Sequence, residues 1–343
     1  MSSRSKLRGA ISGFGEVAAR AHLAGWQTRE AVSITAIHDP ISERRHEALR
    51  LIKNVRVYDD LELMIDGESP DFVDVASPPG LHHEASRAAL AAGAHVLVEK
   101  PLALSLGEFD ELAALAAEKQ RVLMCVHNWK YAPAYAVARR AIEAGRLGDV
   151  RFLSIDRIRT EPAGAGGSGG KWRASAASGG GILIDHGWHV FYLMYWLLGG
   201  EPPLSVSARL ESPVGATVDD VADVRIRFGG GSFCRAHLSW RAPVRRTSAL
   251  IYGDRASIEI EGDRVLLTGR AGKAEDLSVA DIPDDSYHSA WFAGVAQEFQ
   301  QAVTEGTDSP VARRNIAEAR AALMLVEAAR KSSINHGVEI NLS

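Results

Sequence analysis

The sequence contains few cysteines and no long block of charge of one sign. Its two cysteines, Cys125 and Cys234, are far apart, and each sits in an apolar run. This spacing favours neither a disulfide framework nor a metal site, and it fits a reducing, cytoplasmic compartment. The formal net charge is −4 and the basic residues are spread along the chain. We therefore expect no nucleic-acid partner and no binding to anionic membranes.

Long apolar runs and internal repeats are also lacking. No stretch approaches the length of a membrane span, and residues 1–8 are polar with no apolar signal core. What is present is 46% hydrophobic and 24% charged residues in a chain of 343 residues. This composition is typical of a globular enzyme, and the length is sufficient for two domains of roughly 100 to 200 residues each.

The first third of the chain alternates apolar, strand-like runs with alanine-rich helical segments. This alternation predicts right-handed βαβ units and a parallel sheet, the doubly wound Rossmann arrangement. The runs that we expect to be strands are residues 10–12, 32–38, 55–58, 72–76, 95–98 and 122–126.

A glycine motif, Gly13-x-Gly15-x-x-Ala18, stands at the first strand-to-helix turn. Gly13 would allow the tight turn, and Gly15 would let backbone amides approach a pyrophosphate. The motif therefore indicates a dinucleotide site, although a glycine-rich turn without a ligand stays open at this point. The residues that we expect to contact the cofactor here are Gly13, Phe14, Gly15, Glu16 and Val17.

Asp39 ends the second expected strand, at the distance from the glycines where an acidic residue binds a ribose 2′-OH. A carboxylate there repels a 2′-phosphate, so we expect NAD in preference to NADP. Arg44 and Arg45 follow a few residues later and could offset that repulsion, which keeps NADP possible.

Two further loops follow strands of the same sheet. Ser77 and Pro78 begin a proline-rich loop whose backbone has few internal partners and can face a ligand. His82 in this loop either contacts the cofactor or caps the next helix. Glu99 and Lys100 follow the buried run Val96–Val98. Because ligands bind beyond the carboxyl ends of parallel strands, both side chains stand where a cofactor and a substrate could meet, although an ion pair capping the strand is the alternative.

The ordered combination of these motifs resembles the glucose–fructose oxidoreductase, inositol dehydrogenase and MocA family. The resemblance extends into the second half of the chain. The stretches that carry it are Gly13-Phe14-Gly15, Ser77-Pro78-Pro79, Glu99-Lys100-Pro101, Trp172-Arg173 and the segment from Gly179 to His189.

The resemblance implies a two-domain NAD(P)-dependent enzyme that acts on sugars, cyclitols or related polyols. It implies a Rossmann domain in residues 1–128, with a helix at about 312–331 packing back onto it, and a substrate-binding α+β domain in residues 129–311. Asn128 is assigned to the cofactor site. Relatives of this kind assemble as homodimers or homotetramers through an open sheet face.

The second half itself alternates charged and apolar residues in runs joined by short turns. This pattern predicts a largely antiparallel sheet, open on one face. The expected strands are residues 151–159, 204–210, 221–228, 232–240, 247–252 and 257–261. We interpret the glycine-rich segment 163–170 as a mobile flap whose neighbours Trp172 and Arg173 contact substrate. A packed tryptophan beside a solvated arginine is the alternative.

Asp185 and His189 are four residues apart in an apolar segment that reads as a helix. A polar pair on such a helix needs a partner or a task. Oxidation of an alcohol requires its proton to leave, and a neutral imidazole is suited to accept it near pH 7. The family assigns Lys100, Asp185 and His189 to catalysis. His189 would be the base, Lys100 would hydrogen-bond the reacting oxygen, and Asp185 would orient the substrate or His189.

Two positions depart from the family pattern. Tyr192 stands where many relatives have Asp, and Lys130 stands where an Arg is usual. Two other functions stay open. One is a lyase or glycoside-cleaving enzyme that uses bound NAD in transient oxidation, and the other is a non-catalytic NAD-binding sensor. A sensor would be expected to lose one member of the catalytic set, and this chain keeps all three.

Overall fold

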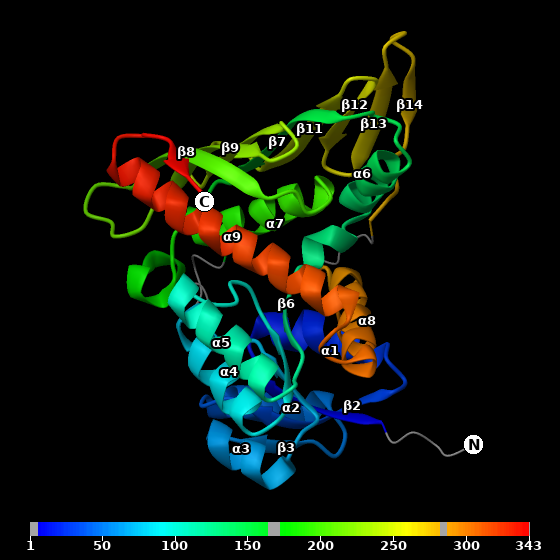
Figure 1. The fold of residues 1–343 in the computed structure, drawn as a ribbon. Helices are drawn as coiled ribbons and strands as arrows, with labels where there is room; N and C mark the ends of the chain where they lie inside the picture. The colour runs from blue at the N-terminus through cyan, green and yellow to red at the C-terminus, as the bar shows by residue number, and fades with distance from the viewer. Residues whose placement is uncertain (1–5, 164–171, 282–286, 343) are drawn as a thin grey trace. The chain divides into compact units, whose positions relative to one another are not determined.

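The computed structural model describes residues 6–163, 172–281 and 287–342. The chain forms two compact units (Figure 1). The first comprises residues 1–128 and 282–316, and the second comprises residues 129–281 and 317–343. Most of the predicted glycine-rich flap, residues 164–170, lies outside the described residues.

The first unit contains a six-stranded parallel sheet in the order β3-β2-β1-β4-β5-β6. This order is that of a doubly wound Rossmann sheet, in which β1 and β4 lie side by side at the point where the strand order reverses. The residues that end these two strands, Ser12 and Val75, are register partners. The strands are β1 (Leu7–Ser12), β2 (Val32–His38), β3 (Arg56–Tyr58), β4 (Phe72–Val75), β5 (His95–Val98) and β6 (Leu123–Cys125).

Helices cover this sheet, and Figure 1 shows α4 beside α5 and α1 beside α8. A cluster of aromatic side chains from α1, β4 and α8 fills the core, with Trp26 and Phe72 rings 4.8 Å apart. A π-helical turn, Ala18–His22, precedes α1. The helices are α1 (Leu23–Gln27), α2 (Ser42–Leu51), α3 (Leu61–Glu68), α4 (His82–Ala91), α5 (Leu106–Glu118) and α8 (Ser289–Glu305).

The second unit contains a nine-stranded sheet in the order β14-β13-β12-β11-β7-β10-β9-β8-β15. All its neighbouring strands are antiparallel except β7 and β10, which are parallel. The predicted fold class, a Rossmann domain plus an α+β domain with a largely antiparallel sheet, is confirmed. The strands are β7 (Val150–Ile158), β8 (Pro203–Glu211), β9 (Val221–Phe228), β10 (Phe233–Ser239), β11 (Arg246–Gly253), β12 (Ala256–Glu261), β13 (Arg264–Gly269), β14 (Ala274–Asp276) and β15 (Ile340–Asn341).

The strands of this second sheet bury alternate residues. In β7, Leu153 and Ile155 are fully buried, whereas Phe152 and Ser154, which alternate with them, are partly exposed. Helices α6 (Pro133–Glu143) and α7 (Trp188–Leu197) belong to the same unit, and α7 is apolar almost throughout. Since side chains alternate between the two faces of a strand, one face of the sheet is the core face and the other is left to solvent.

Helix α9 (Pro310–Ile334) belongs to both units, since the division falls between residues 316 and 317. In the first unit, the Asn315 amide bonds both the N–H and the C=O of Cys125, at 2.7 and 2.9 Å, and so satisfies part of the free edge of β6. In the second unit, Lys130 and Glu318 form a buried ion pair at 2.9 Å.

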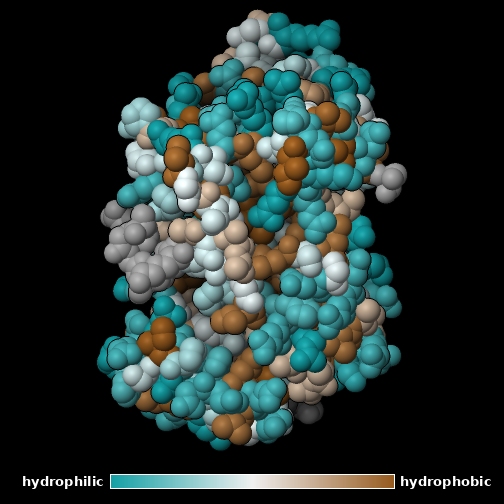
Figure 2. Space-filling view, turned by 90° about the vertical axis from the view of Figure 1, so that its left-hand side faces the viewer, coloured by the Kyte–Doolittle hydropathy of each residue, from teal (hydrophilic) through white to brown (hydrophobic). Residues whose placement is uncertain are grey.

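The surface is that of an ordinary globular protein. Figure 2 shows one face, on which hydrophilic residues predominate with hydrophobic residues scattered between them. Among the helices that the structure describes, none combines the length and the apolar character needed to cross a membrane.

Candidate active site

The glycine turn after β1 has the geometry that its sequence predicts. Gly13 has φ +89°, and a Cβ added there would lie 2.6 Å from the backbone nitrogen of Ser77. Its N–H donates to the carbonyl of His38 at 2.7 Å. No side chain could therefore replace that hydrogen, and the turn packs directly against the loop that follows β4. The structure thus brings two predicted cofactor loops together.

Asp39 lies at the end of β2 and is 1% exposed. Its carboxylate accepts the N–H of Phe14 at 2.8 Å and the N–H of Ile41 at 2.9 Å. The Arg44 guanidinium is 3.4 Å from the same carboxylate and 3.6 Å from where a Cβ on Gly15 would be. An acidic and a basic side chain therefore both adjoin the glycine turn, as the sequence predicts.

The residues around this turn fit a dinucleotide. Nothing but the end of the Arg44 side chain comes within 4 Å of the position of a Cβ on Gly15, so a ligand can approach the backbone there. Among the described residues, the buried Ser77 hydroxyl has no hydrogen-bond partner, and neither has the Asn128 carbonyl oxygen. A bound ligand would supply the missing partners. Glu16 and Val17 are exposed, and Glu16 pairs with Arg20 at 3.1 Å.

His82 joins the two other predicted loops. It is the first residue of α4 but makes no capping hydrogen bond to that helix. Its Nε2 lies 2.8 Å from the carbonyl oxygen of Ser77 and its Nδ1 lies 2.7 Å from that of Pro101. Burial lowers the pKa of His82, so the neutral ring predominates and donates one hydrogen bond. His82 therefore bonds one of the two loops, lies against the other, and is itself 1% exposed.

Glu99 belongs to a buried cluster that sequence reasoning missed. His22 contacts the Asp74 carboxylate through Nδ1 at 3.0 Å and the Glu99 carboxylate through Nε2 at 3.1 Å. Trp26 donates to Asp74 at 2.7 Å, and the Phe292 ring stacks on His22 at 3.9 Å. Burial acts to lower the pKa of His22, but the two carboxylates outweigh it and raise the pKa to about 9. The ring is therefore an imidazolium at neutral pH.

This cluster leads directly to Lys100. The second oxygen of Glu99 accepts the backbone N–H of Lys100 at 2.9 Å, and the Lys100–Pro101 peptide bond is cis. Burial acts to raise the pKa of Glu99, but its bond to His22 and the charges of His22 and Lys100 lower it. Lys100 thus follows β5 with its backbone fixed by an ionised carboxylate, at the carboxyl edge of the sheet where ligands bind.

In the second unit, Asp185 lies in a π-helical turn, Leu183–Gly187, that precedes α7. Such turns are rare and are often found at functional sites. Arg173 donates to the Asp185 carboxylate at 2.9 Å, and its guanidinium lies 4.3 Å from the Trp172 ring. The sequence-predicted residues Arg173 and Asp185 are therefore brought together, and His186 lies 3.9 Å from the same carboxylate.

His189 is 7% exposed in α7 and is held from two sides. Its Nδ1 lies 3.1 Å from the Tyr192 hydroxyl, which also accepts the N–H of Trp129 at 2.9 Å. The imidazole and the Trp129 indole are parallel, with ring centroids 4.2 Å apart. Tyr192, the departure from the family pattern noted above, therefore fixes the ring through a neutral hydroxyl.

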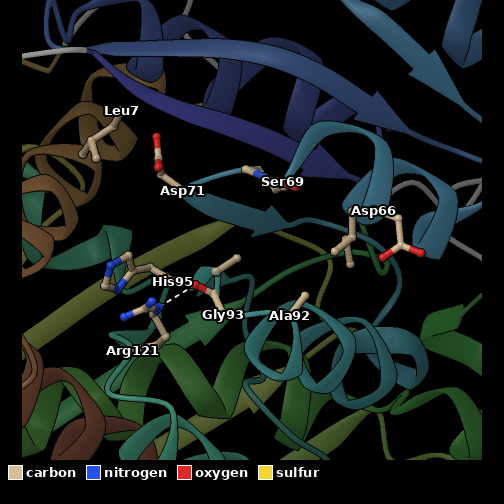
Figure 3. A pocket seen from close by; sticks show the side chains of 11 residues that line it. Leu7, Asp66, Ser69, Asp71, Ala92, Gly93, His95 and Arg121 are labelled. Carbon is tan, nitrogen blue, oxygen red and sulfur yellow. Dashed lines mark hydrogen bonds between the residues drawn. The ribbon is translucent and has the colours of Figure 1, made fainter.

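Two cavities lie away from these residues. The first, about 710 Å³, is at the amino ends of β1, β4 and β5 (Figure 3). His95 and Arg121 line it, and burial together with Arg121 lowers the pKa of His95 to about 4. It is at the opposite edge of the sheet from the glycine turn. The second, about 770 Å³, is formed by β8–β10 and the end of α9, with Arg225 and Arg235 in its lining.

The residues that sequence reasoning missed had weak signals. Asp74 is a charged residue inside the apolar run Phe72–Val75, which predicts a buried partner. His22 is a lone polar residue near the end of the first turn of helix. Trp129 gave no signal, because only the folded chain places it against His189.

Two family models match the chain. Residues 7–127 match an oxidoreductase family with an NAD-binding Rossmann fold, and residues 135–259 match the GFO/IDH/MocA C-terminal domain. The chain belongs to this family. The resemblance that the motifs indicated is confirmed, and the Rossmann domain is of the NAD-binding kind.

Several members of the family are similar over most of their length. D-glucoside 3-dehydrogenase of Escherichia coli (strain K12) is 27% identical over 302 residues, which cover 83% of this chain and 85% of that protein. The scyllo-inositol 2-dehydrogenase (NADP(+)) of Bacillus subtilis (strain 168) is 25% identical over 251 residues, covering 71% and 67%. An inositol dehydrogenase homologue from Azotobacter vinelandii, complexed with NAD+, has a TM-score of 0.85 at 22% identity, and 98% of each chain is covered. That last likeness shows the fold alone.

Proposed function

We propose that this protein transfers a hydride between NAD and a secondary alcohol of a sugar, cyclitol or sugar derivative. The observation that carries the proposal is the fixed ring of His189, which contacts Tyr192 on one side and Trp129 on the other. His189 is also the histidine to which the family resemblance assigns the role of base. A base whose ring cannot turn keeps its nitrogen at the reacting hydroxyl, and that positioning is part of catalysis.

The step assigned to His189 is the transfer of the hydroxyl proton. Oxidation of a carbinol releases the hydroxyl proton, and Nε2 would accept it while Nδ1–H donates to the Tyr192 oxygen. Two hydrogen bonds would then fall on that phenol oxygen, since Trp129 N–H donates to it as well. In the reverse direction the imidazolium returns the proton to the carbonyl oxygen.

Lys100 is assigned the reacting oxygen. An ammonium group at that atom would stabilise the negative charge that develops as the proton leaves. The backbone of Lys100 is held by Glu99, and Glu99 by His22, so the ammonium group starts from a fixed point. Asp185 would orient a neighbouring substrate hydroxyl with Arg173. NAD, when bound, accepts the hydride.

Cofactor contacts are proposed for the residues around the glycine turn. Backbone amides at Gly13–Gly15 would bind the pyrophosphate, and the Asp39 carboxylate would bind the ribose hydroxyls. Ser77 and Asn128 would contribute their unpartnered buried oxygens. We also propose that the protein works in the cytoplasm, where its free cysteines, Cys125 and Cys234, would stay reduced.

The test is a screen of sugars, cyclitols and sugar acids with NAD and with NADP, following the absorbance of the reduced cofactor. We expect net reduction with at least one compound and a loss of at least about a hundredfold in kcat for His189→Asn, the low end for general base catalysis. The matched control is His83→Asn, at a partly exposed histidine of α4 that is assigned no part in the reaction. An undiminished rate in His189→Asn would remove this residue from the mechanism.

We further propose that the exposed face of the nine-stranded sheet pairs with the same face of a second copy. A row of aromatic rings crosses three strands there, with Phe152 5.0 Å from Tyr252 and 6.1 Å from Phe233. Basic residues lie on one side of the row, at Arg225 and Arg235, and acidic residues on the other, on β12. A two-fold axis through the row would place the basic side of one copy against the acidic side of its partner.

The mass in solution tests this pairing. We expect the wild-type protein to be a dimer or a higher multiple, and Phe152→Asp to shift the mass towards the monomer by placing a charge in the apolar centre of the interface. Val214→Asp, at a fully exposed loop position, is the control. A monomeric wild-type protein would contradict the proposal.

A further inference from the structure

Two arginine side chains, Arg157 and Arg159, belong to the same unit as His189. Arg157 and Arg159 follow Leu153 and Ile155 at intervals of two residues, so they point to the core face of the sheet. The Arg157 guanidinium lies 4.4 Å from the Trp129 ring, the same indole that stacks on His189. The Arg157 guanidinium and the His189 imidazole are therefore linked through one indole ring.

The charge of Arg157 is poorly compensated. Among the described residues, no carboxylate lies within ion-pair distance of it, because Asp185, whose charge it feels, is paired with Arg173. Its Nη1 donates to the Thr247 hydroxyl at 2.6 Å, and Arg159 donates to the same hydroxyl at 3.1 Å. Two guanidinium groups thus share one neutral acceptor.

Electrostatics agree with this geometry. Burial and the neighbouring charge of Arg159 lower the pKa of Arg157 to about 9. Burial and the charge of Arg245 lower the pKa of Arg159 to about 10. Placing charges of one sign together in a buried position costs free energy, and a bound anion would recover part of that cost.

Two buried hydrogen-bond donors, one of them part of the Arg157 guanidinium, have no acceptor among the described residues. They are Nε of Arg157 and the hydroxyl of Tyr135. The charge of each of these two groups influences the pKa of the other. Burial raises the pKa of Tyr135 to about 12, so its O–H stays a donor at neutral pH. Native proteins seldom leave buried donors unpaired, and such exceptions often mark a place that a ligand completes. A carboxylate has two oxygens, one for each donor.

We propose that Arg157 and Tyr135 bind a carboxylate of the substrate, and that the substrate is therefore a sugar acid, an aldonate or a uronate, rather than a neutral sugar. The inference rests on the proposed function, because it concerns which alcohol is oxidised. The arginine side chain suits this role because its guanidinium lies over the Trp129 ring and its Nε–H, which has no acceptor among the described residues, could donate to a carboxylate.

The test compares acids with their carboxamides, which have nearly the same shape but no charge. The panel contains D-glucuronate and D-gluconate, each beside its amide, together with D-glucose 6-phosphate and neutral polyols, all with NAD. We expect at least one acid to be oxidised with kcat/KM about 30-fold or more above that of its amide, the low end for a buried charge pair. Equal rates for acid and amide would overturn the proposal, and so would a preference for the phosphate ester.

Two variants assign the preference to Arg157. In Arg157→Met, the ratio of acid to amide should fall to about one, mainly through a higher KM for the acid. Arg151→Met is the matched control, because Arg151 is an exposed residue of the same strand, paired with Asp149 at 2.9 Å. It should keep the ratio. An unchanged ratio in Arg157→Met would overturn the proposal.

Failure of the proposed function would look different. In that case neither acids nor neutral polyols would reduce NAD. The acid–amide comparison in the wild-type protein does not depend on whether Arg157→Met folds, and Arg157→Lys, which keeps the charge but loses the fork, gives a second measure. It should retain only part of the preference for the acid.

Discussion

In the first unit, the buried His22 cation lies between the carboxylates of Asp74 and Glu99, whereas in the second unit Arg157 and Arg159 lie together with no carboxylate within ion-pair distance among the described residues. His22 contacts Asp74 and Glu99 at 3.0 and 3.1 Å. Arg157 and Arg159 share the Thr247 hydroxyl, and the only other acceptors of either guanidinium among the described residues are two neutral carbonyl oxygens, of Ile158 and Arg246, that bond Arg159. The first arrangement is complete without a ligand and stabilises a scaffold. The second costs stability, which a protein retains where a ligand will supply the missing charge.

Replacing His22 by Ala should give the largest effect. The change leaves the buried Asp74 and the partly buried Glu99 without their cation, and removal of one partner from a buried ion pair costs about 3–5 kcal/mol. Chemical denaturation of the protein would measure it. The control is His83→Ala, because His83 forms an exposed pair with Glu111 and exposed pairs contribute about 0–1 kcal/mol. Equal losses in the two variants would show that the cluster is not a special source of stability.

The same cluster predicts how stability depends on pH. The pKa of His22 is about 9 in the folded protein and about 6.5 when unfolded, so the folded state holds its proton more tightly. The contribution is complete below pH 6.5 and is lost as pH rises through 9. It amounts to at most about 3 kcal/mol. Denaturation midpoints between pH 6 and 10 should therefore fall in the wild-type protein, and more gently in His22→Ala. Parallel curves would contradict the assignment.

Cofactor choice tests Asp39, another buried carboxylate of the first unit. Asp39→Ser removes the charge that repels a 2′-phosphate and leaves Arg44 beside the glycine turn. We expect the ratio of kcat/KM for NAD to that for NADP to fall about tenfold or more, since one charge–charge contact corresponds to about 1.4 kcal/mol or more. Arg45→Ser, which instead removes a cation near the turn, should not lower the ratio. A constant ratio in Asp39→Ser would separate Asp39 from cofactor selection.

Arg157→Met should have the smallest effect of these variants. Its effect on the free energy of unfolding should be opposite in sign to that of His22→Ala. Removing a partly buried, uncompensated charge while keeping an apolar chain should leave stability unchanged or raise it by about 1 kcal/mol. Thermal denaturation without substrate, beside Arg151→Met, measures it. A loss comparable with that of His22→Ala would mean that Arg157 is compensated in the folded protein and that the two units do not differ.

The sequence predicted those parts that depend on local pattern. The parallel strands and the Gly13 turn followed from short apolar runs and from a conformation, φ +89°, that suits glycine. The clusters could not be predicted in this way. His22 and Glu99 are 77 residues apart in the chain and meet only because β1, β4 and β5 adjoin.

The second unit was harder to predict, for physical reasons that differ from one element to the next. The short strands β14 and β15 gave no periodic signal, since they gain stability from pairing with the longer strands β13 and β8. The alternation in β7 placed Arg157 with Leu153 and Ile155, but the sequence does not say which of the two faces of a strand the helices cover. The π-helical turn before α7 likewise followed from no residue pattern that we recognise.

The most direct test of the central claim, that Lys100 and His189 act on one alcohol, is a double-mutant cycle. Rates of NAD reduction would be measured for Lys100→Met, His189→Asn and the double variant with the best substrate of the panel. Groups that act as a unit on one oxygen are strongly non-additive, so the double variant should lose little more than the worse single variant. Losses that multiply in full would show that the two residues act independently and would contradict the account.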